Sequence, residues 1–117
     1  MSEYVLLLHE DPTALADVSP GEIEAVIRQY VAWREGLAAE GRLAGGMKLT
    51  DEGGRWLSGA NGDVRVVDGP YSEAKEVIGG LFVIKAASYD EAVEISSGCP
   101  HLAYGGRIEL REVDPVD

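Results

Sequence analysis

The stretch Asp68-Gly-Pro-Tyr-Ser-Glu-Ala-Lys-Glu-Val-Ile-Gly-Gly-Leu-Phe-Val-Ile-Lys85 decides the fold. It begins with the turn signal Asp-Gly-Pro and then places acidic residues and a lysine close together. It ends in the most apolar segment of the chain, residues 80–85. Apolar residues at consecutive positions predict a strand that is covered on both faces.

The N-terminal part predicts another strand of this kind and a long helix. The second doubly apolar strand is Tyr4–Leu8. Ser19-Pro-Gly-Glu22 is a capping box with proline at the first helical position, so a helix should begin there, continue to about Glu40 and end at Gly41. Its apolar stripe comprises Ile23, Val26, Ile27, Tyr30, Val31 and Leu37.

The remaining segments predict four more strands, a hairpin turn and a second helix. Residues 43–50 should form a strand, and the Asn61-Gly62 turn should join strands at 55–58 and 64–67. A second capping box, Ser88-Tyr-Asp-Glu91, opens a helix with Tyr89, Ala92, Val93 and Ser96 on one face, which Cys99-Pro100 closes. Residues 107–113 alternate in polarity, so the last strand should have one polar face.

This order of elements predicts a single domain over residues 1–117. Two helices on one face of a mainly antiparallel sheet give an α+β fold, a ferredoxin-like βα sandwich with an extra β-hairpin. The two doubly apolar strands would leave apolar residues on the open face of that sheet. We therefore predict a symmetric homodimer, packed sheet to sheet as a dimeric α+β barrel.

Composition limits the partners and the location. The formal net charge is −11, with 21 acidic and 10 basic residues and no basic cluster, so nucleic acid and anionic membranes are not expected partners. No apolar stretch is long enough to span a membrane. Met1-Ser-Glu-Tyr4 lacks the basic start of a secretory signal, and Cys99 is the only cysteine, so we expect a cytoplasmic protein without an internal disulfide.

Three residues are candidates for catalysis. Asp68 could act as a general base at a cleft, or it could cap the turn that follows it. His9 and His101 are the only histidines, so a proton shuttle that uses imidazole near neutral pH must use one of them. Either could pair with Asp68, or be a structural or solvated residue.

The candidates for substrate binding are charged or aromatic. Tyr71, Glu73, Lys75 and Glu76 could line a pocket in which Lys75 holds a carboxylate, or they could form a surface ion-pair cluster. Arg34 lies within the apolar stripe of the first helix and could bind an anion, or lay its stem on the core and extend its head to solvent.

No cofactor or metal is expected. The histidine spacing matches no zinc or iron pattern, and the glycine pairs lack the lysine of a phosphate-binding loop. Cys99 lies at the C-terminal end of a helix, where the dipole opposes thiolate formation. Trp33 and Trp56 are expected to pack in the core or at an interface.

Several of these segments together resemble the YCII-related or DGPF domain family. They are Tyr4–Leu8 before Glu10-Asp-Pro12, Leu43 and Gly45-Gly46 after the first helix, Asp68-Gly-Pro-Tyr71 with Glu73, Lys75-Glu76 and Gly79-Gly80, Cys99-Pro100-His101, and Gly105–Arg111. The chain has Tyr71 where the family name records phenylalanine, and Leu110 where valine is frequent. The resemblance implies a dimeric α+β barrel.

The resemblance also implies two classes of function. Some smaller relatives have a histidine and an aspartate in a pocket, which implies acid–base chemistry. With Asp68 as base and His9, His101 or Lys75 assisting, such chemistry would suit a small anionic or aromatic metabolite. Other members are encoded beside alternative sigma factors, which implies a ligand-binding or regulatory module. Whether this chain is an enzyme therefore stays open on the sequence.

Overall fold

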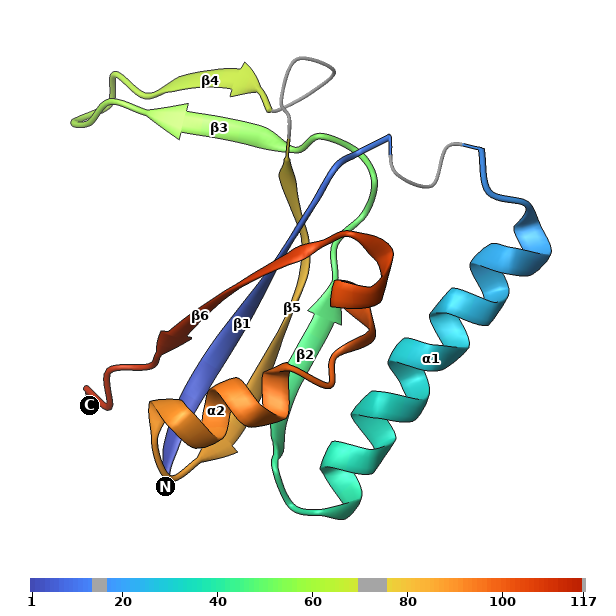
Figure 1. Ribbon diagram of the computed structural model, residues 1–117. Coiled ribbons are helices and arrows are strands. Elements are labelled where there is room, and N and C mark those ends of the chain that lie inside the picture. Colours follow the sequence, from blue (N-terminus) through green and yellow to red (C-terminus); the bar gives the residue numbers. More distant parts are fainter. Residues whose placement is uncertain (14–16, 70–75, 117) are drawn as a thin grey trace.

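The fold is seen in a computed structural model that describes residues 1–13, 17–69 and 76–116 (Figure 1). The elements in chain order are β1 (Ser2–Glu10), α1 (Pro20–Ala39), β2 (Leu43–Lys48), β3 (Arg55–Ser58), β4 (Arg65–Asp68), β5 (Val77–Ala86), α2 (Tyr89–Ser96), the 3-10 helix η1 (Pro100–Tyr104) and β6 (Arg107–Glu112). In the described part of the chain, no helix is both long and apolar enough to cross a membrane.

The main sheet has four antiparallel strands in the order β2-β5-β1-β6. This order, with α1 after β1 and α2 after β5, is the ferredoxin-like arrangement that the sequence predicts. β3 and β4 pair only with each other, as a separate two-stranded sheet inserted between β2 and β5. The predicted α+β sandwich with an extra hairpin is confirmed.

The local signals read from the sequence determine where the helices and the hairpin turn begin. The Ser19 hydroxyl accepts a hydrogen bond from the Glu22 N–H at 3.3 Å, and Ser88 accepts one from the Glu91 N–H at 3.2 Å. Asn61 has a φ of +57°, as its turn requires. The 3-10 helix η1, which carries His101, was not predicted from the sequence.

The core lies between the helices and one face of the sheet. Its buried apolar residues come from alternate positions of β1 and β5, from α1 and α2, and from the segment between α2 and η1. They are Tyr4, Leu6, Leu8, Leu37, Phe82, Ile84, Ala86, Ala92 and Cys99. Trp33 of α1 packs edge-on against Phe82, with ring centroids 5.1 Å apart. Packing on this one face fixes both helices against the sheet.

The predicted buried faces of the helices are wrong in part. Ile27 and Val31 of α1 are about half exposed, and so are Tyr89 and Val93 of α2. Each helix contacts the sheet along a narrow strip, and these residues lie at its margin. The Tyr89 hydroxyl still accepts a hydrogen bond from the Glu112 N–H at 2.7 Å.

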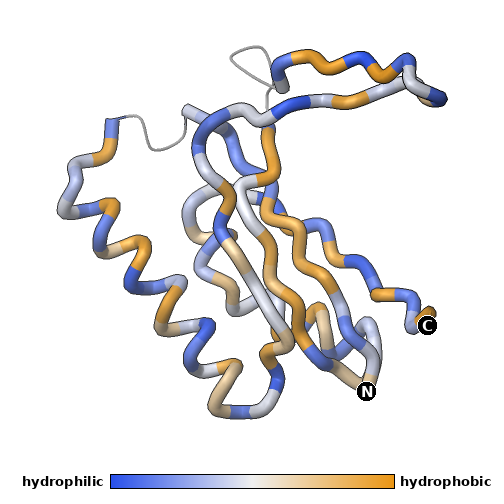
Figure 2. Tube along the Cα trace, turned by 180° about the vertical axis from the view of Figure 1, so that it is seen from behind, coloured by the Kyte–Doolittle hydropathy of each residue, from blue (hydrophilic) through white to orange (hydrophobic). Residues whose placement is uncertain are grey.

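The opposite face of the sheet, which we call the open face, also carries apolar side chains. Val5 and Leu7 of β1 lie opposite Val83 and Leu81 of β5, and all four are only half-buried. In Figure 2, apolar residues run along the neighbouring central strands, and the helices lie beside or behind them. Among the described residues, no helix covers this face.

A β-bulge interrupts the pairing of β1 with β5. Leu8 lies opposite Gly80 whereas His9 lies opposite Ile78, so Gly79 is the extra residue. A Cβ atom on Gly79 would collide with the Glu10 carboxylate, and one on Gly80 would lie 2.8 Å from the backbone oxygen of Met47. Close approach of backbone therefore requires glycine at position 80, whereas at position 79 the flexible Glu10 side chain could move aside.

Candidate functional site

A histidine–carboxylate pair lies on the open face, near the end of β1. His9 Nε2 lies 3.0 Å from Glu109 Oε1. Glu109 comes from β6, where it faces Leu7, and Arg107 faces His9 itself. The His9 side chain is 23% exposed and that of Glu109 is 45% exposed, so solvent reaches the pair in a single chain.

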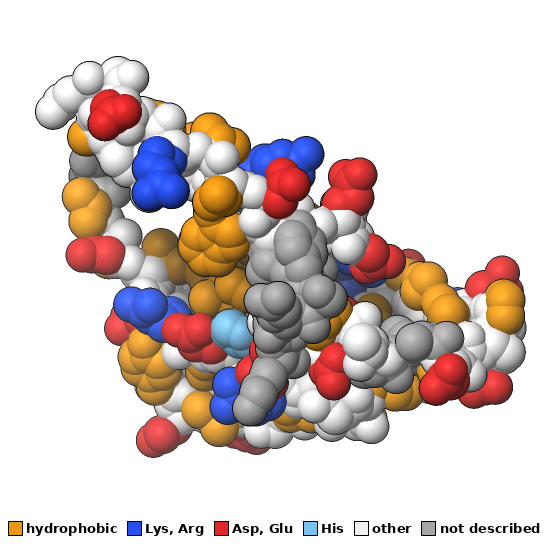
Figure 3. Space-filling view, turned by 90° about the horizontal axis from the view of Figure 1, so that it is seen from above, with side chains coloured by type: hydrophobic (Ala, Val, Ile, Leu, Met, Phe, Trp, Pro, Cys, Tyr) orange, Lys and Arg blue, Asp and Glu red, His pale blue; other side chains and the backbone are white. Residues whose placement is uncertain are grey.

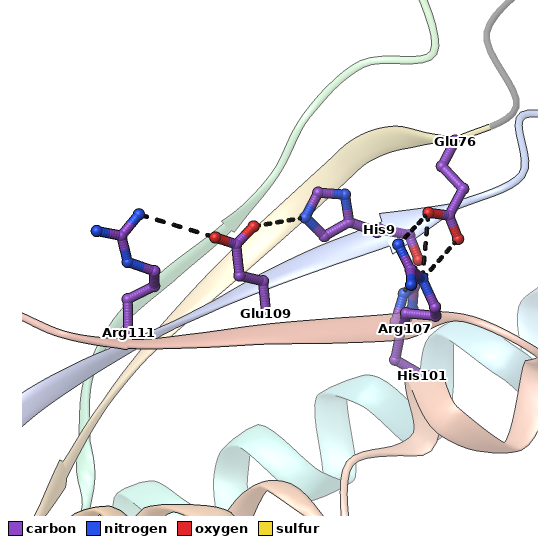
Figure 4. A network of polar contacts seen from close by, with 6 residues as sticks. All are labelled: His9, Glu76, His101, Arg107, Glu109 and Arg111. Carbon is purple, nitrogen blue, oxygen red and sulfur yellow. Dashed lines mark hydrogen bonds and ion pairs between the residues drawn. The ribbon is translucent and has the colours of Figure 1, made fainter.

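Two arginines extend this pair into a row of alternating charges (Figure 4). Arg107 donates from Nε and Nη2 to the Glu76 carboxylate at 2.7–3.2 Å, and Arg111 Nη1 lies 3.8 Å from Glu109 Oε2. The hydrogen bonds that Arg107 donates to Glu76 raise the pKa of its guanidinium, which stays charged. We call His9, Glu76, Arg107, Glu109 and Arg111 the His9 cluster.

The His9 cluster borders an open hollow of about 340 Å³, lined by His9, Arg107, Ile108 and Glu109. Figure 3 shows a surface histidine with acidic and basic side chains on one side and apolar side chains beside it. The charged groups are therefore at the margin of an apolar surface. This surface can receive a small molecule that has both an anionic and an apolar part.

His101 lies on the helix side of β1 and is only 4% exposed. Its Nε2 lies 2.8 Å from the His9 carbonyl oxygen, and its Nδ1 lies 2.8 Å from the Tyr30 hydroxyl. Since a carbonyl oxygen only accepts, Nε2 carries the proton, and Nδ1 of the neutral ring accepts from Tyr30. Burial raises the pKa of Tyr30, so this hydroxyl stays protonated.

The buried ring of His101 therefore holds the backbone of His9 from behind. Gly106 makes room for it, because a Cβ atom there would overlap the ring. Both ring nitrogens of His101 already have partners within the protein. In this arrangement His101 positions His9, and His9 is the histidine that solvent can reach.

Asp68 is an exposed residue of the hairpin. It ends β4 in the hairpin, its side chain is 81% exposed, and its Oδ1 lies 3.4 Å from Arg55 Nε. Among the described residues, it forms no hydrogen bond or ion pair with either His9 or His101. A single chain does not supply the desolvation that a general base near neutral pH requires at this position.

The other predicted binding residues separate into three groups. Glu76 joins the His9 cluster through Arg107. Arg34 is exposed on α1, consistent with an arginine whose head extends to solvent. Tyr71, Glu73 and Lys75 lie outside the described residues.

Sequence reasoning missed Arg107, Glu109 and Arg111 as functional candidates. The alternation of residues 107–113 places all three on one face of a strand, and this polar face is a signal in the sequence. Their proximity to His9 depends on the antiparallel register of β6 with β1, which the sequence pattern alone leaves undetermined.

Cys99 is a core residue, and burial raises the pKa of its thiol. The thiolate is the form that attacks thiol reagents, so a raised pKa and burial both slow the reaction. We expect Cys99 of the native protein to react with Ellman's reagent at pH 8 at least about 100-fold more slowly than in 6 M guanidinium chloride. A native rate close to the denatured one would contradict the buried position.

Within residues 1–13, 17–69 and 76–116, no group of three or more histidine, cysteine, aspartate or glutamate side chains has the arrangement of a metal site. The His9 cluster itself supplies imidazole, carboxylate and guanidinium groups. Imidazole can transfer a proton near neutral pH, a carboxylate can orient it, and guanidinium groups can bind an anion.

The fold and the His9 cluster define a small ferredoxin-like α+β protein with charged groups on an uncovered sheet face. The chain belongs to the YCII-related domain family, whose sequence model matches residues 2–117. An uncharacterised protein of Rhizobium meliloti (strain 1021) is 30% identical over 94 residues, which cover 80% of this chain and 76% of the relative.

One solved structure is similar to this chain over most of the length of both proteins. It is the 5-chloro-2-hydroxyhydroquinone dehydrochlorinase of Burkholderia phenoliruptrix in complex with 2,5-dihydroxybenzoquinone. The match has a TM-score of 0.49 and 17% sequence identity, and it covers 97% of this chain and 94% of the dehydrochlorinase chain.

Proposed function

We propose that this protein is a homodimer, packed open face to open face, that binds a small anionic metabolite at the His9 cluster and transfers a proton through His9. The observation that carries the proposal is the 3.0 Å contact between His9 Nε2 and Glu109 Oε1. It places an oriented imidazole beside two arginines on an apolar surface.

The exposed area of the single chain supports a dimer. Its accessible surface is 8214 Å², whereas a compact monomer of 12.5 kDa exposes about 6,200 Å². The excess of roughly 2,000 Å² is larger than the ~800 Å² that each partner buries in a standard stable interface. The apolar open face is the surface that gains most from being covered.

The contacts of His9 support a role in proton transfer. In the neutral ring, Nε2–H donates to Glu109, which leaves Nδ1 as the acceptor that can take a proton from a ligand. A carboxylate behind an imidazole fixes its tautomer and stabilises the imidazolium that forms. Covering the open face with a second copy lowers the local dielectric constant, which strengthens these interactions.

The contacts of Arg107 support binding of an anion. Glu76 takes donors at Nε and Nη2, and a guanidinium has further N–H groups that can bind a ligand carboxylate. The pair with Glu76 also holds the guanidinium in one orientation. A planar anionic or aromatic acid would place its charge near Arg107 and its apolar part on the sheet.

A ligand-binding module without turnover is the second candidate. Arg107 and Arg111 favour it, because two cations can hold an anion without any proton transfer. The two candidates differ in what they require of His9. A sensor keeps its affinity when an amide replaces the imidazole, whereas an enzyme loses turnover.

The test is a thermal-shift screen of wild type, His9→Gln and Asp68→Asn against small carboxylic acids, lactones and phenolic acids. A ligand at 100 times its Kd stabilises the native state by about 2.7 kcal/mol, which is a shift of several degrees. We expect the ligand-induced rise in melting temperature seen with the wild type to be kept in Asp68→Asn and to be smaller in His9→Gln. Ligands that bind His9→Gln normally and Asp68→Asn poorly would place the site in the hairpin and contradict the proposal.

A further inference from the structure

The β3–β4 hairpin carries apolar side chains on both of its faces. Trp56 pairs with Val67 on one face, and Leu57 pairs with Val66 on the other. These four side chains are 52–65% exposed in the single chain. A hairpin in contact with water on one face alternates apolar and polar residues, and this hairpin lacks that alternation at its centre.

Little within the described chain holds the hairpin. Its strands pair only with each other, and the Gly69 N–H donates to the Gly54 carbonyl at 3.0 Å to close its base. An isolated two-stranded hairpin is marginally stable in water, and stability requires packing against another surface. Two apolar faces therefore imply a covering surface that the single chain does not supply.

The position of the hairpin indicates where that surface lies. The hairpin leaves the sheet at the end where β1 finishes and β5 begins, and it projects to the side away from α1 (Figure 1). It also makes the chain extended: the radius of gyration is 16.2 Å, compared with about 13 Å for a compact chain of this length. An arm of this kind can reach a second molecule.

The charge of the hairpin favours a second copy of this chain as that molecule. Two copies with a formal charge of −11 each repel one another over most of their surface. The hairpin lacks that acidic excess, because Arg55 and Arg65 balance Asp63 and Asp68. The contact between two acidic chains is most favourable where the net charge is zero and the surface is apolar.

We propose that the hairpin is an intersubunit arm that packs against the second copy of the homodimer, with Trp56 as its buried anchor. The inference rests on the proposed dimer and adds the arm to its interface. In a two-fold dimer each copy gives one arm and receives one, so both exposed hairpins are covered at once. A large aromatic residue at such a contact is the type that dominates binding energy.

Tryptophan fluorescence tests the arm directly. Trp33→Phe leaves Trp56 as the sole tryptophan, and its emission maximum and acrylamide quenching are followed on dilution, beside light scattering on the same samples. We expect the dimer to show a blue-shifted emission and at least threefold weaker quenching. Both signals should change to those of an exposed indole at the concentration where the mass halves.

Each alternative result has its own meaning. A dimer in which Trp56 is quenched like free tryptophan overturns the arm and leaves the proposed dimer standing. A monomer at every concentration overturns both, and protection that persists in the monomer overturns the arm, because the hairpin is then covered by its own chain.

A second variant avoids dependence on the Trp33 substitution. Trp56→Ala, with all other residues native, should weaken dimerisation at least tenfold and leave the circular dichroism of the chain unchanged. The matched control is Leu102→Ala, which changes a partly exposed residue of η1 on the helix side. Equal dimer affinity for Trp56→Ala and the control overturns the arm.

Discussion

Replacing Leu6 by alanine should lower the free energy of unfolding by about 3 kcal/mol, within the 2–5 kcal/mol range typical of buried leucines. Leu6 is fully buried and lies opposite Phe82 and Leu110 in the centre of the sheet. Both neighbouring strands hold its backbone, so the site cannot collapse to fill the cavity. Chemical denaturation at a fixed protein concentration measures the loss, which in a thermal scan is roughly 10 °C.

Leu102→Ala is the matched control, because it removes the same atoms from a residue that is 44% exposed. We expect this variant to lose less than about 1 kcal/mol. Equal losses for the two variants would show that Leu6 is not the centre of the core. The comparison also removes the contribution of dimerisation, because neither side chain lies on the open face.

Replacing Leu81 by glutamate should convert the proposed dimer to a monomer. Leu81 lies on the open face opposite Leu7, and the proposed interface would bury one glutamate from each copy. A buried carboxylate without a partner is strongly unfavourable, so we expect dimerisation to weaken by about 100-fold or more. Light scattering over a concentration series measures the change in mass, and circular dichroism checks the fold.

Val31→Glu is the control for charge, because it adds the same carboxylate to the exposed side of α1. We expect that variant to remain as dimeric as the wild type. If Leu81→Glu also stays dimeric, the open face is not the interface and the proposed function fails with it. If both variants dissociate, general repulsion between acidic chains explains the result.

The fold was predictable because its determinants are local. Ser19 and Ser88 mark helix starts by hydrogen bonds to residues three positions later, and such signals depend on a few neighbouring residues only. Apolar runs in β1 and β5 similarly identify the central strands. The exposure of Ile27 and Val31 was not predictable, because it depends on how α1 lies against the sheet.

The site was less predictable because it joins residues that are far apart in the chain. His9 and His101 were both candidates from the sequence, and Glu109, which contacts His9, is 100 positions away and reaches it through strand register. Asp68 was chosen for its turn and its chemistry, and the structure places it in the hairpin with Arg55. Composition identifies the residue types, whereas pairing decides which of them meet.

The bulge at Gly79 determines toward which face of the sheet the earlier residues of β5 point. Side chains alternate between the two faces of a strand, so one extra residue exchanges the faces of all earlier positions. With the bulge, Ile78 lies opposite His9, and Glu76, two residues earlier, has the same parity and reaches Arg107. If Gly79 were instead paired regularly, without the bulge, Glu76 would point toward the helices and Arg107 would lack that carboxylate.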